Sequence, residues 1–204
     1  MTVELNDIGR RFNQEWIFRG LTYQFDSGHN YAILGPNGSG KSTLLSIIMG
    51  NLTPSSGSVS YHKDRKITVE QIYQHLGFAA PYLDLIEEFS LQESLDFHFQ
   101  FKELLPGLHK KDLLDLLGLA RSQDKPLKYF SSGMKQRTKL VLACCTAAPL
   151  LVLDEPTSNL DAQGVAWYHQ LITEFTAKKT VIIGSNQESE YSFCNHFVQI
   201  SDYK

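Results

Sequence analysis

Residues 35–43 have the types and spacing of a loop that binds phosphate. Glycines let the backbone curl until successive N–H groups point at phosphate oxygens, and the helix expected next presents its positive N-terminal end to the same anion. The lysine of such a loop reaches the β- and γ-phosphates of a nucleotide, and the hydroxyl after it can bind Mg²⁺. The loop consists of Gly35, Pro36, Asn37, Gly38, Ser39, Gly40, Lys41, Ser42 and Thr43.

Two carboxylates follow an apolar run further along the chain. Residues 150–153 are aliphatic, and Asp154 and Glu155 come directly after them. Ligands of α/β sheets bind at the carboxyl ends of strands, where these acids are expected. Asp154 would hold Mg²⁺, directly or through water, and Glu155 could polarise a water for in-line attack. Acids after a strand are also common as solvated turn residues, but the phosphate loop upstream favours the catalytic interpretation.

A third motif, Ser131-Ser-Gly-Met-Lys-Gln-Arg137, precedes Asp154 by 23 residues. Ser131 or Ser132 is a natural N-cap for the helix that follows. The exposed N–H groups and the hydroxyl at that helix end form a second candidate anion site. Taken alone, the same residues are more typical of an ordinary capped helix.

Together with Ser158-Asn-Leu-Asp161, these motifs stand in an order that resembles the ATP-binding cassette (ABC) ATPase family, over residues 2–200. The resemblance implies ATP and Mg²⁺ as cofactors, with Ser42 and Asp154 as metal ligands. It implies that Lys41 and Glu155 are catalytic. It also implies a second ABC subunit as partner, in a head-to-tail dimer that holds ATP between the two chains.

Ser131, Ser132, Gly133 and Met134 stand where the family carries Ser-Gly-Gly-Gln. The first Ser and the second Gly are kept. The resemblance therefore implies that Ser131, Ser132 and Gly133 of one subunit bind ATP held by the phosphate loop of the other. Residues 158–161 would form a loop that crosses the dimer interface.

Three further positions are weaker matches to the family. Phe12 matches an aromatic that stacks on adenine, although a lone Phe at a strand end is otherwise a core residue. Pro81 stands where a glutamine should contact Mg²⁺ and the attacking water. Asn186 stands in the place of a histidine that touches the γ-phosphate. We expect Asn186 to act as a weaker catalytic group and basal hydrolysis to be slow.

Alternating apolar and polar patterns predict the elements that position these residues. Strands are expected at 2–8, 16–25, 30–34, 58–61, 76–80, 150–153, 180–183 and 196–200, and helices at 42–49, 90–101, 109–117, 132–147 and 163–176. The predicted class is α/β: a P-loop NTPase core with a mainly parallel sheet, an N-terminal antiparallel β subdomain and a small helical insert. A single ABC ATPase domain would span 1–204, with the insert at roughly 82–130.

Composition excludes several classes of protein. The 204 residues are 42% hydrophobic and 20% charged, with a net charge of −3, so bulk positive charge cannot drive binding and no nucleic-acid partner is expected. Three cysteines form no disulfide framework, and buried free thiols of a reducing compartment are expected. The N-terminus lacks the features of a signal peptide, and the longest apolar run, 140–153, is too short to span a membrane.

The function expected from the resemblance is an ATP-binding and ATP-hydrolysing subunit that powers a separate integral membrane permease. Its place would be cytoplasmic, peripheral on the inner face of the cell membrane, and residues 82–89 would meet the permease. The compact cassette favours export over import. Two alternatives stay open: a nucleotide-dependent switch or assembly module with weak hydrolysis, and a soluble non-transport ABC ATPase.

Overall fold

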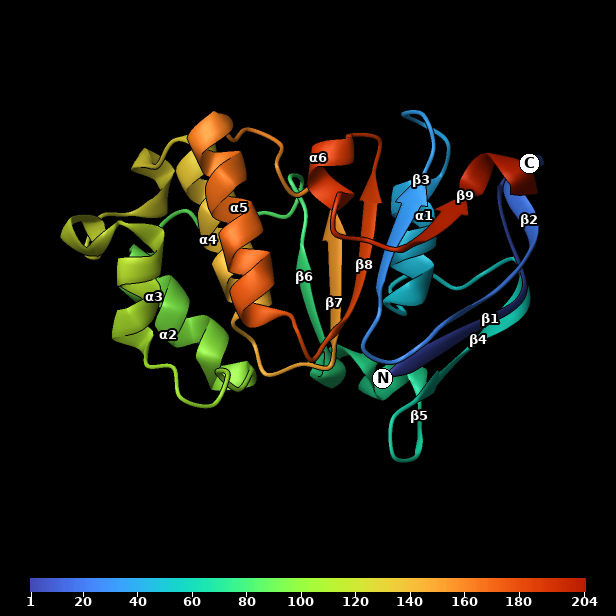
Figure 1. The fold of residues 1–204 in the computed structure, drawn as a ribbon, viewed down its shortest axis with the longest axis horizontal. Coiled ribbons are helices and arrows are strands. Elements are labelled where there is room, and N and C mark those ends of the chain that lie inside the picture. The colour runs from blue at the N-terminus through green and yellow to red at the C-terminus, as the bar shows by residue number, and fades with distance from the viewer. The chain divides into compact units, whose positions relative to one another are not determined.

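The computed structural model describes residues 1–204, which divide into two units (Figure 1). The first unit contains residues 1–76, 149–155 and 178–204, and the second contains residues 77–148 and 156–177. The single-domain organisation expected from the sequence stays a prediction.

An antiparallel sheet forms the N-terminal part of the first unit. Its strand order is β2-β1-β4-β5, and the turn between β1 and β2 includes Asn13, whose φ is 54°. At the start of β1 the buried Val3 and Leu5 alternate with the half-buried Thr2 and Glu4, as a strand with one face in the core requires. The strands are β1 (Thr2–Phe12), β2 (Glu15–Phe25), β4 (Ser56–His62) and β5 (Lys66–Ile67). The antiparallel β subdomain is thereby confirmed.

The other strands of the first unit run parallel, in the order β7-β8-β3-β9. They are β3 (Asn30–Leu34), β7 (Leu150–Asp154), β8 (Thr180–Ser185) and β9 (His196–Gln199). Every residue of β7 and β8 is buried, which explains their continuous apolar sequences. Leu34 pairs with Ser185 and Asp154 pairs with Gly184, so the carboxyl ends of β3, β7 and β8 meet at one edge. Helix α1 (Lys41–Ile48) packs against β7 and β8.

Four long helices dominate the second unit, which begins within β6 (Leu76–Ala79). They are α2 (Leu91–Phe101), α3 (Lys110–Leu117), α4 (Ser132–Cys144) and α5 (Ala162–Phe175). Figure 1 shows α4 and α5 running side by side, and α3 also packs against α4. Ser90 and Glu93 form a capping box at the start of α2, and Gly118 ends α3 in the left-handed conformation.

The end of α4 differs from the sequence-based prediction, which placed it at residue 147. The helix ends at Cys144 because the next residues bond to another segment: Ala147 N–H donates to the Glu103 carbonyl at 2.7 Å, and Leu105 N–H donates to the Cys145 carbonyl at 2.8 Å. The sequence analysis also missed short elements at Lys66–Ile67, at Val69–His75 and in α6 (Glu188–Tyr191), which are too short to show a hydrophobic period.

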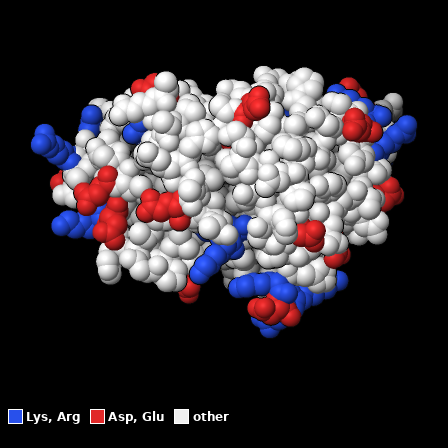
Figure 2. Space-filling model, in the orientation of Figure 1, with Lys and Arg blue, Asp and Glu red and all other residues white.

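All three cysteines are buried and free, as expected. No helix combines the length and the apolar character that a membrane-spanning segment needs. Figure 2 shows Lys and Arg interspersed with Asp and Glu on the face viewed, without a large area of one sign.

Candidate nucleotide site

The predicted phosphate loop connects β3 to α1 in the first unit. Its turn is closed by a hydrogen bond from Ser39 N–H to the Pro36 carbonyl at 3.1 Å. Gly40, the N-cap of α1, has a φ of 106°, in the left-handed region that favours glycine. The buried Ser39 hydroxyl lacks a hydrogen-bond partner within the protein, as suits a loop that donates to a bound anion.

Side chains from distant parts of the chain leave no room for substituents on this loop. A Cβ on Gly40 would lie 2.6 Å from Ile17 Cγ2, and a Cβ on Gly35 would lie 2.8 Å from Ile200 Cγ2. Ile17 belongs to β2 and Ile200 begins the 3₁₀ helix Ile200–Tyr203. The glycines therefore serve close packing as well as backbone curvature, which the motif alone did not reveal.

Lys41 is buried within the loop, with only 5% of its surface exposed. Its Nζ donates to the Gly35 carbonyl at 2.8 Å and to the Pro36 carbonyl at 3.3 Å. These bonds hold the ammonium inside the curve of the loop, where phosphate oxygens would be its natural partners. Ser42 is exposed in the first turn of α1, and Thr43 follows it, half-buried.

The two acids lie where β7 ends, at the edge of the sheet that also carries the phosphate loop. Asp154 is 1% exposed and is the last residue of the strand. Glu155 is half-buried with a φ of 41°, an unusual conformation for a residue with a side chain, and its N–H donates to the Gly184 carbonyl at 2.9 Å.

Gly184 is a site residue that the sequence analysis missed. It pairs with Asp154 across β7 and β8, and a Cβ at this position would lie 3.0 Å from Asp154 Oδ1 and 2.8 Å from Leu45 Cδ1. The glycine therefore keeps room for the carboxylate between the sheet and α1. A glycine inside a strand was the available signal, because it often marks a close approach.

Asn186 follows β8 and reaches the phosphate loop. Its Nδ2 donates to Asn37 Oδ1 at 2.9 Å. The preceding Ser185 hydroxyl is bonded to the fully buried Glu190 carboxylate, and Gln187 N–H donates to Ser185 Oγ at 2.9 Å. Asn186 therefore lies against the phosphate loop, and its catalytic role stays a prediction.

Phe12, the candidate adenine-stacking residue, lies at the exposed end of β1. Its ring is 48% exposed, and the Arg10 guanidinium lies 4.5 Å from the ring centroid. This cation–π contact occupies one side of the ring. The exposure argues against a core role, and stacking on adenine stays a prediction.

The second candidate anion site lies in the second unit, at the start of α4. Ser131 is the N-cap, and its Oγ accepts from Met134 N–H at 3.2 Å. Ser131 and Ser132 are exposed, and a Cβ on Gly133 would lie 3.0 Å from the Asn159 carbonyl. The three residues line an open hollow of about 490 Å³ together with Arg137, Asn159 and Asp161. Binding of ATP by Ser131, Ser132 and Gly133 stays a prediction.

Pro81 stands where a glutamine was expected. It lies in the second unit, one residue beyond Ala80, which follows the end of β6. Its carbonyl accepts a hydrogen bond from the buried Lys139 of α4, which the sequence analysis did not single out. The side chain of Pro81 offers no oxygen for a metal ion, as the sequence already showed.

A family model described as ABC transporter matches residues 18–158. The chain belongs to the ABC transporter family. As an ABC cassette it is an ATPase, and the parallel and antiparallel sheets are those expected of this fold.

Relatives of this cassette include transport proteins of several kinds. It is 29% identical to the uncharacterized ABC transporter ATP-binding protein YcbN of Bacillus subtilis, over 90% of this chain and 61% of that longer protein. It is 29% identical to the lantibiotic transport ATP-binding protein SrtF of Streptococcus pyogenes, over 96% of this chain and 85% of SrtF. It is 32% identical to the sulfate/thiosulfate import protein CysA of Bradyrhizobium diazoefficiens, over 80% of this chain and 49% of CysA.

Solved structures agree on the fold of the cassette. The dimeric structure of the bacterial ABC transporter cassette MJ0796 matches with a TM-score of 0.80 at 22% identity, over 97% of this chain and 93% of that chain. At this identity the likeness establishes the fold, and the roles of individual residues depend on the geometry described above.

Proposed function

We propose that this ABC cassette is the subunit whose ATP hydrolysis powers a separate membrane permease. The observation that carries the proposal is the meeting of a buried Lys41 and a buried Asp154 at one edge of the parallel sheet, with Glu155 next to them in the chain. A lysine in the glycine loop after β3 and two acids at the end of β7, two strands away in the same sheet, are the groups that phosphoryl transfer requires.

Each group has a distinct role in the proposed reaction. Lys41 and the loop N–H groups bind the β- and γ-phosphates, and Glu155 accepts a proton from the attacking water. Ser42 and Asp154 would hold Mg²⁺, and their hydroxyl and carboxylate oxygens are the ligands that this ion prefers. When bound, Mg²⁺ neutralises charge on the phosphate oxygens. Asn186 can donate a hydrogen bond to the γ-phosphate, but it cannot exchange protons near neutral pH as a histidine can.

The proposed active form is a head-to-tail dimer with a second ABC subunit. The phosphate loop and the Ser131–Gly133 segment are two separate sites for anions, and pairing two chains lets each nucleotide contact one of each. Sedimentation of the Glu155→Gln variant with and without Mg-ATP tests this arrangement. We expect a dimer with Mg-ATP, whereas a monomer with bound ATP at high protein concentration would contradict it.

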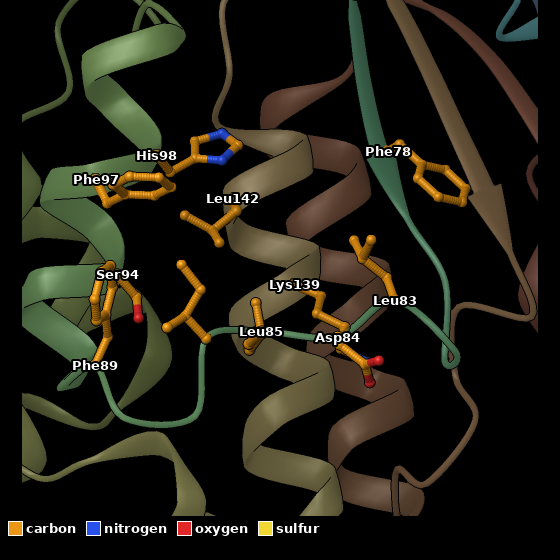
Figure 3. Close-up of a pocket in the computed structure, with 11 residues that line it drawn as sticks. Phe78, Leu83, Asp84, Leu85, Phe89, Ser94, Phe97, His98, Lys139 and Leu142 are labelled. Carbon is orange, nitrogen blue, oxygen red and sulfur yellow. The ribbon is translucent and has the colours of Figure 1, made fainter. Parts of the chain in front are cut away.

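The permease is proposed to contact residues 82–89 of the second unit. Tyr82 is 56% exposed and Ile86 is 43% exposed, which is unusual for large apolar side chains that lie close together. Ile86 also lines a cavity of about 200 Å³ (Figure 3), together with other apolar side chains that include Phe78, Leu85, Phe89, Phe97 and Leu142. An exposed apolar segment that lines an apolar cavity fits the docking of a protein partner.

A photo-crosslinking amino acid at position 82 tests this contact in membranes from the native host. We expect a crosslink to an integral membrane protein that depends on position. The control is the same amino acid in place of Tyr73, which is similarly exposed at 59% but lies in the first unit. Equal crosslinking from both positions, or none from position 82, would contradict the proposal.

Export is the proposed direction, and the inner face of the cell membrane is the proposed location. Support for the transport role itself is the similarity to the lantibiotic transport relative, which is 29% identical over 96% of this chain. A nucleotide-dependent switch with weak hydrolysis is the second candidate, favoured by Pro81 and Asn186. Steady-state hydrolysis that stays below about one turnover per minute at millimolar ATP, with the permease bound, would favour the switch.

A further inference from the structure

Two lysines on one face of α4 hold the segment that follows β6. Lys139 Nζ donates to the Pro81 carbonyl at 2.7 Å and to the Ala80 carbonyl at 3.3 Å. One turn nearer the start of the helix, Lys135 Nζ is paired with the Glu87 carboxylate. Residues four apart lie on the same side of a helix, so both ammonium groups face residues 80–87.

The burial of Lys139 points to more than packing by an aliphatic stem. The residue is only 7% exposed, and burial lowers the pKa of its ammonium, an effect that the negative charge of Asp84 opposes. Lysine is among the residues least often buried, because a charged group loses hydration there. An apolar residue would fill the same space without that cost. The hydrogen bonds to the two carbonyls are what the ammonium adds.

The backbone hydrogen bonds differ between the two ends of the segment. Leu83 N–H donates to the Ala80 carbonyl at 3.3 Å, a long bond, whereas the far end is fixed by Leu127 N–H and Lys128 N–H, which donate to the carbonyls of Phe89 and Glu87 at 2.8 and 2.9 Å. Figure 3 shows Lys139 projecting from α4 towards the segment that carries Leu83 and Asp84. Lys139 therefore anchors the start of the segment to the helix.

The same helix begins at the exposed Ser131–Gly133 segment. Lys135 and Lys139 follow Ser131 by four and eight residues of unbroken helix, which is about 6 and 12 Å along the axis. A helix of this length is stiff. A force applied to residues 80–87 therefore reaches the start of α4 through these two lysines.

We propose that Lys135 and Lys139 form a latch that makes residues 80–87 and the start of α4 move as one body, with Lys139 as a positioning residue for ATP hydrolysis. This inference rests on the proposed function, because a permease on residues 82–89 would use the latch to move Ser131–Gly133. The latch itself is a property of the free chain and can be measured without hydrolysis.

The test compares amide hydrogen exchange in Lys139→Met, Lys139→Arg and Lys128→Met. Methionine keeps the stem without the charge, arginine restores a donor, and Lys128 is an exposed lysine near the other end of the segment. We expect exchange in peptides covering 80–87 to rise about tenfold in Lys139→Met and to return towards wild type in Lys139→Arg. Lys128→Met should leave exchange there unchanged.

A second variant tests whether motion of residues 80–87 reaches the start of α4, by loosening residues 80–87 themselves. Pro81→Gly should raise exchange in peptides covering 80–87 and 130–136 when both lysines are present. In a Lys135→Met, Lys139→Met background it should affect only 80–87. If Lys139→Met fails to fold, Lys135→Met alone tests the latch. We then expect a smaller rise in amide exchange in peptides covering 80–87.

Hydrolysis gives an independent measure of the positioning role. We expect Lys139→Met to lower kcat several-fold with KM for Mg-ATP unchanged, and Lys139→Arg to recover part of the loss. Unchanged exchange at 80–87 in a folded Lys139→Met chain would overturn the latch. If instead the exchange results hold but the wild-type chain does not hydrolyse ATP, the proposed function fails and the latch stands.

Discussion

Replacing Gly184 with alanine should impair the magnesium site through packing alone. The new Cβ would lie 2.8 Å from Leu45 Cδ1 and 3.0 Å from Asp154 Oδ1. Carbon atoms in contact prefer about 3.5–4.0 Å, so either α1 or the carboxylate must shift. Overpacking of this size costs about 1–3 kcal/mol of folding stability, and each kcal/mol lowers the Tm of a chain of this length by about 2–4 °C.

The shift of Asp154 should appear as weaker use of Mg²⁺. We expect the Mg²⁺ concentration for half-maximal hydrolysis at saturating ATP to rise about tenfold, as for other changes next to metal ligands. ATP binding measured in EDTA should change little, because the phosphate loop is untouched. Gly28→Ala is the control: its φ of 77° makes alanine costly by about 1–2 kcal/mol, yet a Cβ there meets nothing within 4 Å. A lowered Tm with an unchanged Mg²⁺ midpoint in Gly184→Ala would refute the reasoning.

Three further predictions concern other parts of the chain. Lys41→Ala should weaken ATP binding about 10–100-fold by calorimetry, because it removes a charged donor from the phosphates, and unchanged affinity would contradict the loop's role. Pro81→Gln combined with Asn186→His should speed the isolated subunit about tenfold or more in a steady-state ATPase assay if those groups limit the rate; no increase would show that other residues supply them. Burial lowers the pKa of His98 to about 4, below its value in the unfolded chain. The contribution of the neutral His98 to the free energy of unfolding is therefore full above about pH 6.5 and is lost as the pH falls towards 4. This loss, at most about 3 kcal/mol by denaturant titration, should be absent from His98→Gln.

The strands that carry the candidate site could be predicted because the phosphate loop and the acids depend on local spacing, whereas the catalytic roles stay predictions. Strand β3 and the carboxyl end of β7 lie where the apolar runs placed them. Gly184 and Ile200 could not be assigned in the same way. Their importance comes from contacts with residues far away in the chain, namely Asp154 and Gly35, and single-sequence patterns do not report such contacts.

Lys139 illustrates the same limit within the second unit. In the sequence it is one charged residue inside an apolar helical pattern, where a solvated position is the usual expectation. Only the fold shows that its ammonium reaches the carbonyls of Ala80 and Pro81, about 60 residues earlier. Likewise, the end of α4 depended on backbone bonds to residues 103–105, which local helical propensity cannot predict.

The measurement that tests the central claim most directly is ATP turnover by Glu155→Gln, with ATP affinity measured on the same protein. The account predicts unchanged ATP binding and a turnover reduced about 100-fold or more, because glutamine keeps the shape of the side chain and removes the base. Glu188→Gln, an exposed carboxylate at the start of α6, should turn over ATP like the wild type. Turnover in Glu155→Gln equal to that of the wild type would contradict the assignment of Glu155 as the catalytic base.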